Sequence, residues 1–176
     1  MPAFLAAAII NCACERKLPT VNKTEILNLP SQVVRNDTTV YTDSGRIQLI
    51  MTTPLMERYT DNDSPYSEFR SGIRVTFYDG GKDPVGSATA NYARYTEKKK
   101  LWELRDSVVV VNETNDKLET EQLFWDQEKE LIYTDRFVEI TNEDQTVRGI
   151  GFESDTRLRK RKIRNVTATI YLEEGE

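Results

Sequence analysis

Apolar and polar residues alternate along most of the chain from about Val40 onward, which is the pattern of half-buried β-strands. GRIQLIMTT (45–53) places Ile47, Leu49 and Met51 on one face, and GIRVTFYD (72–79) repeats the alternation. No stretch keeps a helical spacing long enough to form the crossover that parallel strands need. The pattern therefore predicts an all-β fold of short antiparallel strands, either a sandwich or an open barrel.

Polar turn residues separate the remaining predicted strands. The strands are SATANYARY, LWEL, VVVVN, LETEQLFW, LIYT, FVEIT and NVTATIYL, and the turns are Arg105-Asp106, Asn115-Asp116, Gln127-Glu128 and Asn142-Glu143-Asp144. In VVVVN, Val108 and Val110 face one way, whereas Val109 and Val111 face the other. A strand that is apolar on both sides is typical of a central strand, and an edge strand awaiting a partner is the alternative.

The chain also contains an internal repeat. LWELRDSV (101–108) corresponds to LIYTDRFV (131–138), and each follows an aromatic-bearing strand and a charged turn. Looser copies occur in 52–79 and 151–171. Such repeats predict units stacked along an axis, with open strand edges on the two end units.

The first residues, MPAFLAAAIINCACERK, are small and apolar before they become charged. The run is too short for a membrane span, which needs about 20 residues. We interpret 1–14 as a lipoprotein signal region that ends at an acylated cysteine, Cys14 or alternatively Cys12. An apolar terminus with two incidental cysteines is the other interpretation. We assign 15–38, which contains two prolines, to a linker and 39–174 to the β domain.

Composition limits the chemistry. The net charge is −5, which argues against binding to nucleic acid. There is no histidine, and both cysteines lie within the first fourteen residues. The β domain therefore has no thiol nucleophile, histidine base or Cys/His metal site, and we expect no cofactor. Paired carboxylates could still act on carbohydrates, with Trp102 and Trp125 as sugar platforms, and this is the enzyme alternative.

Four segments resemble the LptC family in its lipoprotein-anchored form: VYTDSGRIQLIMTTPLMERY, ATANYARYTEKKKLWELRDSVVVVNE, KLETEQLFWDQEKELIYTDRFVEI and GIGFESD with KIRNVTATIYLEE. The resemblance covers about Leu29 to Glu173. It implies an LptC/OstA-like β-jellyroll, that is, an open, V-shaped antiparallel roll. The glycines of GIGF are expected to permit a kink or a close approach of strands, not to bind phosphate.

The resemblance also implies a function. LptC-like proteins receive lipopolysaccharide from an inner-membrane ABC transporter and pass it to an LptA-like periplasmic bridge protein, without catalysis. By resemblance, an N-terminal edge near Tyr41–Thr52 would pair with the transporter, and a C-terminal edge near Asn165–Leu172 would pair with the bridge protein. The expected location is the periplasmic face of the inner membrane, held there by a lipid anchor. A scaffold lipoprotein whose β-sandwich carries no lipid is the alternative.

The residues expected to line the lipid groove share one face of their strands. They are Ile47, Leu49, Met51, Ile73, Val75, Phe77, Trp102, Leu104, Val108, Val110, Ile132, Val138 and Ile140. Periodicity alone is equally met by an ordinary packed core. The basic run RLRKRKIR (157–164) supplies candidate contacts to lipopolysaccharide phosphates: Arg157, Arg159, Lys160 and Arg161. A solvated turn that balances an acidic surface is the alternative.

Overall fold

The computed structural model describes residues 29–60 and 63–170, so Cys12, Cys14 and the signal region lie outside it. This part of the chain forms one twelve-stranded sheet, and every strand pair in it is antiparallel. The strands are β1 (Gln32–Asp43), β2 (Arg46–Tyr59), β3 (Tyr66–Phe69), β4 (Ile73–Phe77), β5 (Gly86–Ala90), β6 (Tyr92–Thr96), β7 (Leu101–Val111), β8 (Lys117–Asp126), β9 (Leu131–Thr141), β10 (Gln145–Asp155), β11 (Arg161–Ile163) and β12 (Thr167–Ile170). One short 3-10 turn, Glu97–Lys99, precedes β7.

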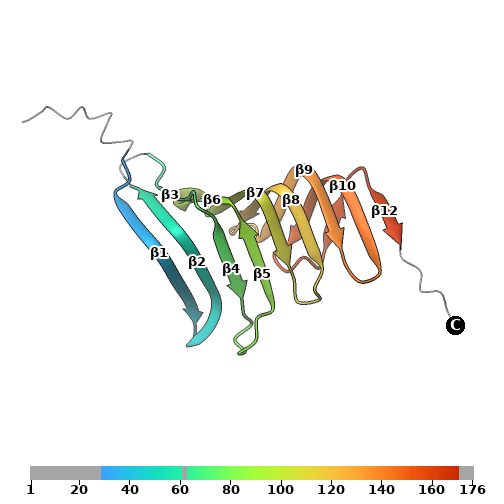
Figure 1. The fold of residues 1–176 in the computed structure, drawn as a ribbon, viewed down its shortest axis with the longest axis horizontal. Helices are drawn as coiled ribbons and strands as arrows, with labels where there is room; N and C mark the ends of the chain where they lie inside the picture. Colours follow the sequence, from blue (N-terminus) through green and yellow to red (C-terminus); the bar gives the residue numbers. More distant parts are fainter. Residues whose placement is uncertain (1–28, 61–62, 171–176) are drawn as a thin grey trace, which may run out of the picture.

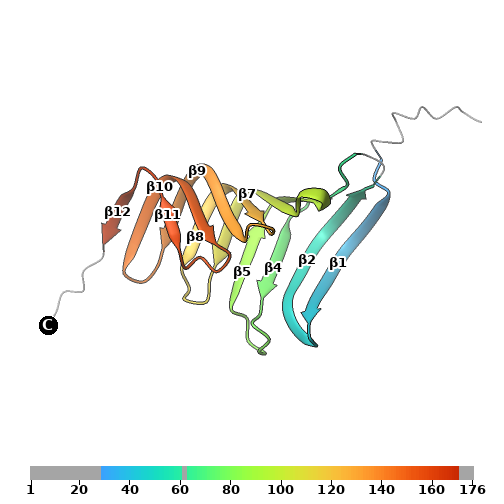
Figure 2. The ribbon, with the colours of Figure 1, turned by 180° about the vertical axis from the view of Figure 1, so that it is seen from behind.

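Long strands divide their length between two layers. The first half of β2 pairs with β4 and its second half with β3, while β7 pairs with β6 and then with β5. Layer 1 therefore contains β4, β5 and β12, and layer 2 contains β3, β6 and β11. The strands succeed one another along the long axis, with β1 at one end and β12 at the other (Figure 1). The view from behind shows β11 beside β10 (Figure 2). The fold is an open antiparallel β-jellyroll, as predicted.

The bend between the layers consists of irregularities that lie at the same level in successive strands. Between β1 and β2, the pairing skips Asn36 and Pro54. In β7, Asp106 and Ser107 form a bulge with φ of 62° and 57°. The pairing of β8 with β9 also shifts, and that of β9 with β10 shifts at Gly151, whose φ is 82°. Because a bulge adds an unpaired residue and increases local twist, this bend line turns each strand from one layer into the other.

Buried threonines supply hydrogen bonds that the ladder lacks along the bend line. Thr53, Thr120 and Thr134 are 3%, 7% and 1% exposed. The Oγ1 of Thr53 donates to the Gly72 carbonyl at 2.8 Å, and that of Thr120 donates to the Phe137 carbonyl at 2.8 Å. The Oγ1 of Thr134 accepts a backbone N–H two residues further on at 3.1 Å. Backbone groups left unpaired by the bulges thus regain partners.

One predicted turn is wrong. Arg105-Asp106 does not separate two strands, because LWEL and VVVVN are halves of the single strand β7. LIYT and FVEIT are likewise halves of β9. A bulge and a turn favour the same short polar residues, so sequence alone does not distinguish them. The other three predicted turns do connect strands. The repeat is confirmed in three dimensions, since β7 and β9 cross the bend line at equivalent positions.

The first strand also differs from the prediction. β1 begins at Gln32, within the segment assigned to a linker, and it forms the N-terminal edge. Most of the predicted edge strand, Tyr41–Thr52, belongs to β2, which is the next strand inward. Ten of the twelve residues of β1 are exposed, so neither face needs to be apolar and the alternation that marks strands is missing.

Gly149 and Gly151 have the roles predicted for them. A Cβ at Gly149 would lie 2.4 Å from Cγ2 of Ile163 and 2.6 Å from the carbonyl oxygen of Arg164. Glycine therefore permits the close approach of the strand that follows β10. Gly151 adopts a positive φ at the bend line, a conformation that other residues rarely adopt.

Candidate lipid-carrying interior

One row of apolar side chains crosses layer 1 almost from edge to edge. The pairing registers place its members opposite one another, strand after strand: Met51, Val75, Ala88, Val110, Leu118, Ile140 and Val147. At the two edges the row ends in exposed positions, Thr39 in β1 and Ala168 in β12. Nine strands spaced by about 4.8 Å make a row of about 38 Å. Its buried members face layer 2.

Layer 2 supplies the opposite wall, which is richer in aromatic residues. Phe69, Ala93, Leu104 and Leu123 lie opposite one another in successive strands and are all buried. Trp102 stacks on Phe69 with ring centroids 5.6 Å apart.

The two tryptophans bear on the enzyme alternative. Trp102 pairs with Trp125, and both are half-buried against the core. Neither lies on the outside of the fold as a sugar platform. Among the described residues, no group of three or more His, Cys, Asp or Glu side chains could hold a metal ion.

The structure brings most of the predicted lipid-lining residues together. Seven are buried in one core: Ile73, Leu104, Val108, Val110, Ile132, Val138 and Ile140. Four are half-buried against that core: Met51, Val75, Phe77 and Trp102. Leu49 is half-buried further out, whereas Ile47 is 37% exposed near the tip of the β1–β2 hairpin. Alternation alone placed Ile47 inside, but the hairpin extends beyond the strands that could cover it.

Burial is uneven along the interior. In the centre, Val108, Leu118, Val138 and Phe152 are at most 1% exposed, so the layers are in full contact there. Toward the N-terminal end, Phe69 and Ile73 are still buried, but Met51, Met56, Val75 and Phe77 are only half-buried. Methionine adapts its shape easily because it is unbranched and has three rotatable side-chain bonds. Half-buried and adaptable side chains make the N-terminal half of the interior a candidate entry for another apolar molecule.

A cavity of about 250 Å³ lies at the C-terminal end between the layers. Its apolar walls are Ile140 and Val147 from layer 1 and Ile163 from layer 2. Polar groups also line it: Asn142, Gln145 and Arg161. The interior thus has space at this end beyond the packed centre.

A larger cavity, of about 620 Å³, lies on the outside of the bend line. Its lining includes Thr38, Thr52, Arg74 and Thr89, which the strand registers place on the face opposite to the apolar row. This cavity is mainly polar, although two residues of the buried core, Ile73 and Ala90, also line it.

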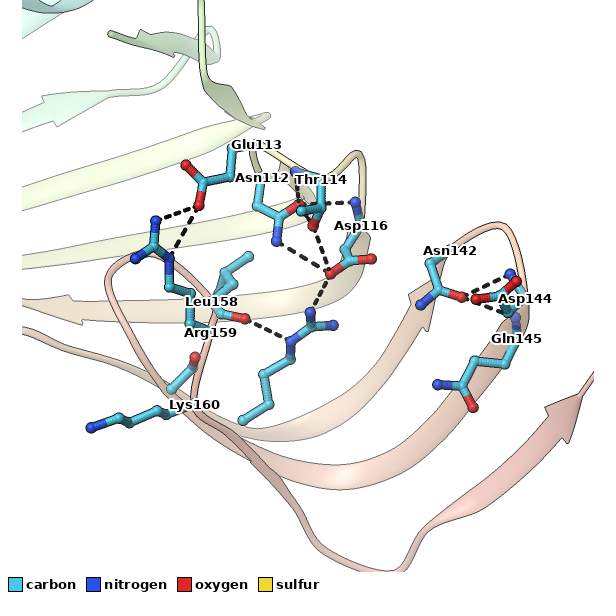
Figure 3. Close-up of polar contacts among 12 residues, drawn as sticks. Asn112, Glu113, Thr114, Asp116, Asn142, Asp144, Gln145, Leu158, Arg159 and Lys160 are labelled. Atoms are coloured by element: carbon cyan, nitrogen blue, oxygen red, sulfur yellow. Dashed lines mark hydrogen bonds and ion pairs between the residues drawn. The ribbon is translucent and has the colours of Figure 1, made fainter. Parts of the chain in front are cut away.

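Two of the four predicted phosphate contacts are paired with carboxylates. Arg159 binds Glu113, and Arg161 binds Asp116. Arg157 and Lys160 are exposed. Figure 3 shows Glu113 and Asp116 on the turn between β7 and β8, facing the segment that carries Arg159. The basic run is therefore a structural contact between the two layers as well as a source of positive charge.

Asp116 is held in its charged form. Burial raises the pKa of its carboxyl group, but hydrogen bonding and charge from Arg161, with further hydrogen bonds from Asn112 and Thr114, outweigh burial and lower the pKa below its ordinary value. The side chain of Asp116 is 9% exposed. An ion pair with one partner so well shielded from water is less screened by salt than a surface pair.

Both ends of the sheet have an unpaired edge within the described strands. β1 pairs only with β2, and β11 and β12 pair only with β10. β1 also exposes Val33, Val40 and Tyr41, which are 48%, 50% and 57% exposed. Long open edges of this kind are normally covered or blunted in soluble proteins, because they pair readily with other strands.

Several residues of the interior were missed by the sequence analysis. Met56 and Leu123 continue the apolar faces of β2 and β8, and counting the alternation across the bulges would have found them. Leu158 is buried although it lies within the basic run. A single apolar residue among cations was its only signal. The pairing of Asp116 with Arg161 joins residues 45 positions apart, and no local pattern indicates it.

The architecture defines the class of protein: a two-layered β-jellyroll with an apolar interior and open edges at both ends. Residues 7–174 match the family model described as lipopolysaccharide-assembly, LptC-related, so the chain belongs to the LptC family and has a role in lipopolysaccharide transport. This is a family of periplasmic, inner-membrane-associated transport components and not of enzymes. No curated protein matches the chain significantly. No helix within 29–60 or 63–170 is long and apolar enough to cross a membrane.

Proposed function

We propose that this protein carries lipopolysaccharide by holding its acyl chains between the two layers of the jellyroll. The observation that carries the proposal is the apolar row, which spans the sheet with Thr39 and Ala168 at its two ends. Each methylene group removed from water contributes about 0.8 kcal/mol, so a continuous apolar surface attracts an acyl chain without fixing its position along the row. A carrier needs such a surface because it must also release its cargo.

Acyl chains first occupy the N-terminal half of the interior. Met51, Val75 and Phe77 are only half-buried there, whereas the centre is filled by the protein's own side chains. Entry at this end requires the least displacement of packed residues. Passage toward β12 then requires the layers to separate at the centre, with acyl chains replacing the contacts that the layers make with each other.

The two open edges bind the neighbours in the pathway. We assign β1 to the inner-membrane ABC transporter that delivers lipopolysaccharide, and β11 with β12 to an LptA-like bridge protein that receives it. In each case a partner strand would extend the sheet by β-augmentation, so that the apolar row continues from one protein into the next. Acylation at Cys14, or alternatively Cys12, would hold the protein at the periplasmic face of the inner membrane.

Photo-crosslinking tests this function directly. A photoreactive amino acid at Val75 or Val110 is expected to form adducts with lipopolysaccharide in cells. The same probe at Thr76 or Val109, which the strand alternation directs to the opposite face, is the matched control. Adducts at the control positions alone, or only with protein at all four, would contradict a lipid-carrying interior.

A charge inside the interior provides a second measurement. Val110→Arg places a cation on the apolar row and is expected to reduce lipid adducts at Val75 by at least tenfold. Val109→Arg, on the other face of β7, should leave them near the wild-type level. Circular dichroism would show whether both variants fold, and unchanged adducts in a folded Val110→Arg protein would argue against the interior as the binding surface.

The packed centre favours a second candidate function. Because Val108, Leu118 and Val138 are fully buried, the fold could act as a scaffold lipoprotein that connects its partners without holding lipid itself. The scaffold predicts partner binding through the edges but no lipid adduct at Val75 or Val110. The crosslinking experiment therefore separates the two candidates.

A further inference from the structure

The segment between β10 and β11 crosses the open side of the jellyroll. It leaves layer 2 after Asp155 and contacts the turn at the rim of layer 1 between β7 and β8. Nη2 of Arg159 lies 2.5 Å from Oε1 of Glu113, and its Nε donates to the same oxygen at 3.1 Å (Figure 3). Arg161 donates to the carboxylate of Asp116. These two ion pairs, here called the clasp, join the free rims of the two layers.

Leu158 fills the space beneath the clasp. Its side chain is 3% exposed and belongs to the core between the layers. Its φ of 57° lies in the left-handed region, which is unfavourable for a residue other than glycine. Its N–H donates to the Asp155 carbonyl at 3.0 Å, and its own carbonyl accepts Nε of Arg161 at 2.6 Å. Burial of Leu158 and the clasp thus hold each other in place.

Hydrogen bonds within the turn hold the carboxylate side of the clasp. Asn112 Oδ1 accepts the N–H groups of Thr114 and Asp116 at 3.0 and 2.9 Å, which fixes the turn. Asn112 Nδ2 and Thr114 Oγ1 each lie 3.2 Å from Oδ2 of Asp116 (Figure 3). The turn therefore presents its acceptor oxygens to the opposite layer within one short loop.

The two ion pairs differ in exposure. The side chains of Arg159 and Glu113 are 55% and 40% exposed, whereas those of Arg161 and Asp116 are 29% and 9% exposed. A guanidinium group binds phosphate with the same planar donor geometry that it uses for carboxylate. A phosphate group arriving at the open side can therefore replace Glu113 on Arg159, while Asp116 remains shielded.

The clasp borders the C-terminal cavity, because Arg161 also lines that cavity beside Ile163. Releasing the segment would withdraw Leu158 from the core and connect the packed centre with the cavity near β12. We propose that the clasp is a gate at the exit end of the interior, and that it loosens when a phosphate group of the cargo displaces Glu113 from Arg159 and leaves Arg161–Asp116 as its one remaining ion pair. This inference rests on the proposed function, since it assigns a direction of passage to the same interior.

Charge variants of the full-length chain test the gate. Photoreactive probes at Val75 and at Val147, which lines the C-terminal cavity, report adducts at the entry and exit ends. The probe ligand is purified lipopolysaccharide, either phosphorylated or treated with phosphatase. In the wild type, removal of phosphate is expected to lower adducts at Val147 several-fold and to leave those at Val75 unchanged. Glu113→Arg breaks the exposed ion pair of the clasp, so adducts at Val147 should rise several-fold and no longer depend on phosphate.

The charge swap distinguishes a gate from a simple anion site. Arg159→Glu breaks the same exposed ion pair and is expected to raise adducts at Val147. Glu113→Arg combined with Arg159→Glu restores the pair and should return the adducts to the wild-type level. If the two single variants change the adduct yield at Val147 in opposite directions and the double variant does not restore it, Arg159 only attracts anions. That result would overturn the gate. An adduct yield at Val147 that stays the same in every variant would also overturn the gate. If the probe at Val75 also forms no lipid adduct in the wild type, both the gate and the proposed function fail.

Discussion

At the scale of single residues, threonines at core positions mark where each strand bends. Thr53, Thr120 and Thr134 follow Met51, Leu118 and Ile132 by two positions, so strand alternation directs them inward. A hydroxyl group there must find a partner, and each finds a backbone group at the bend line. Threonines at inward-facing positions of an otherwise apolar strand face therefore indicate, in the sequence itself, where the strand bends.

Replacing one of these hydroxyl groups tests its contribution to stability. Thr120→Val keeps the shape of the side chain but leaves the Phe137 carbonyl without its 2.8 Å hydrogen bond. We expect the free energy of unfolding to fall by about 1–3 kcal/mol, as for other buried groups that lose a partner. Urea denaturation measures the change. Thr156→Val, at an exposed position, is the control and should change stability by less than about 0.5 kcal/mol. Equal stability of the two variants would contradict the role of Thr120.

The ion pair of Asp116 predicts a dependence of stability on pH. The carboxyl pKa is lower in the folded protein than in the unfolded chain, where it is about 3.9. Its contribution is therefore fully present above the unfolded pKa and is lost as pH falls through the lower, folded pKa. Arg161, Asn112 and Thr114 all hydrogen-bond to the carboxylate of Asp116.

Comparison with Asp116→Asn isolates this effect from other carboxyl groups. The difference in unfolding free energy between the wild type and the variant should be constant from about pH 5 to 8 and shrink below about pH 4. Urea titrations across the pH range supply both values. A difference that grows as the solution becomes more acidic would contradict the assigned ion pair.

At the scale of elements, alternation predicted strands wherever one face is buried and the other is not. It succeeded for β4, β7 and β9, whose apolar residues are among those in or against the core. It failed for β1, because an edge strand exposed on both faces carries no apolar period. Alternation also could not show that β2 pairs with both β3 and β4, because that depends on where the bend line crosses β2.

Proline substitutions in β1 test the proposed pairing of the N-terminal edge. At two neighbouring positions, Thr39 and Val40, one N–H points toward β2 and the other toward the open edge. Proline removes the N–H, so Thr39→Pro and Val40→Pro should differ. The proline that removes an N–H directed at β2 is expected to lower the melting temperature. The proline that removes an N–H directed at the open edge should keep the melting temperature but abolish co-purification with the transporter. Undiminished co-purification of the stable variant would contradict pairing through β1.

At the scale of the whole molecule, the repeat of thirty residues predicted stacked units and open ends, and the structure has both. The residues of the interior could largely be named from the sequence, because they alternate along strands. The clasp could not be named, because it joins Glu113 and Asp116 to the distant Arg159 and Arg161 across the open side. Contacts between layers depend on how far the sheet twists, which no local pattern records.

Under the proposed function, the bend line has a consequence for the range of glycolipids that the interior could hold. Continuous backbone joins the layers at the long strands, so the angle between them can change through a few torsions at each bulge while the strands themselves stay intact. A binding space whose width can change does not select its ligands by their number of acyl chains. Glycolipids with four, five or six fatty acids should therefore be accepted almost equally, and any preference among them must arise elsewhere in the pathway.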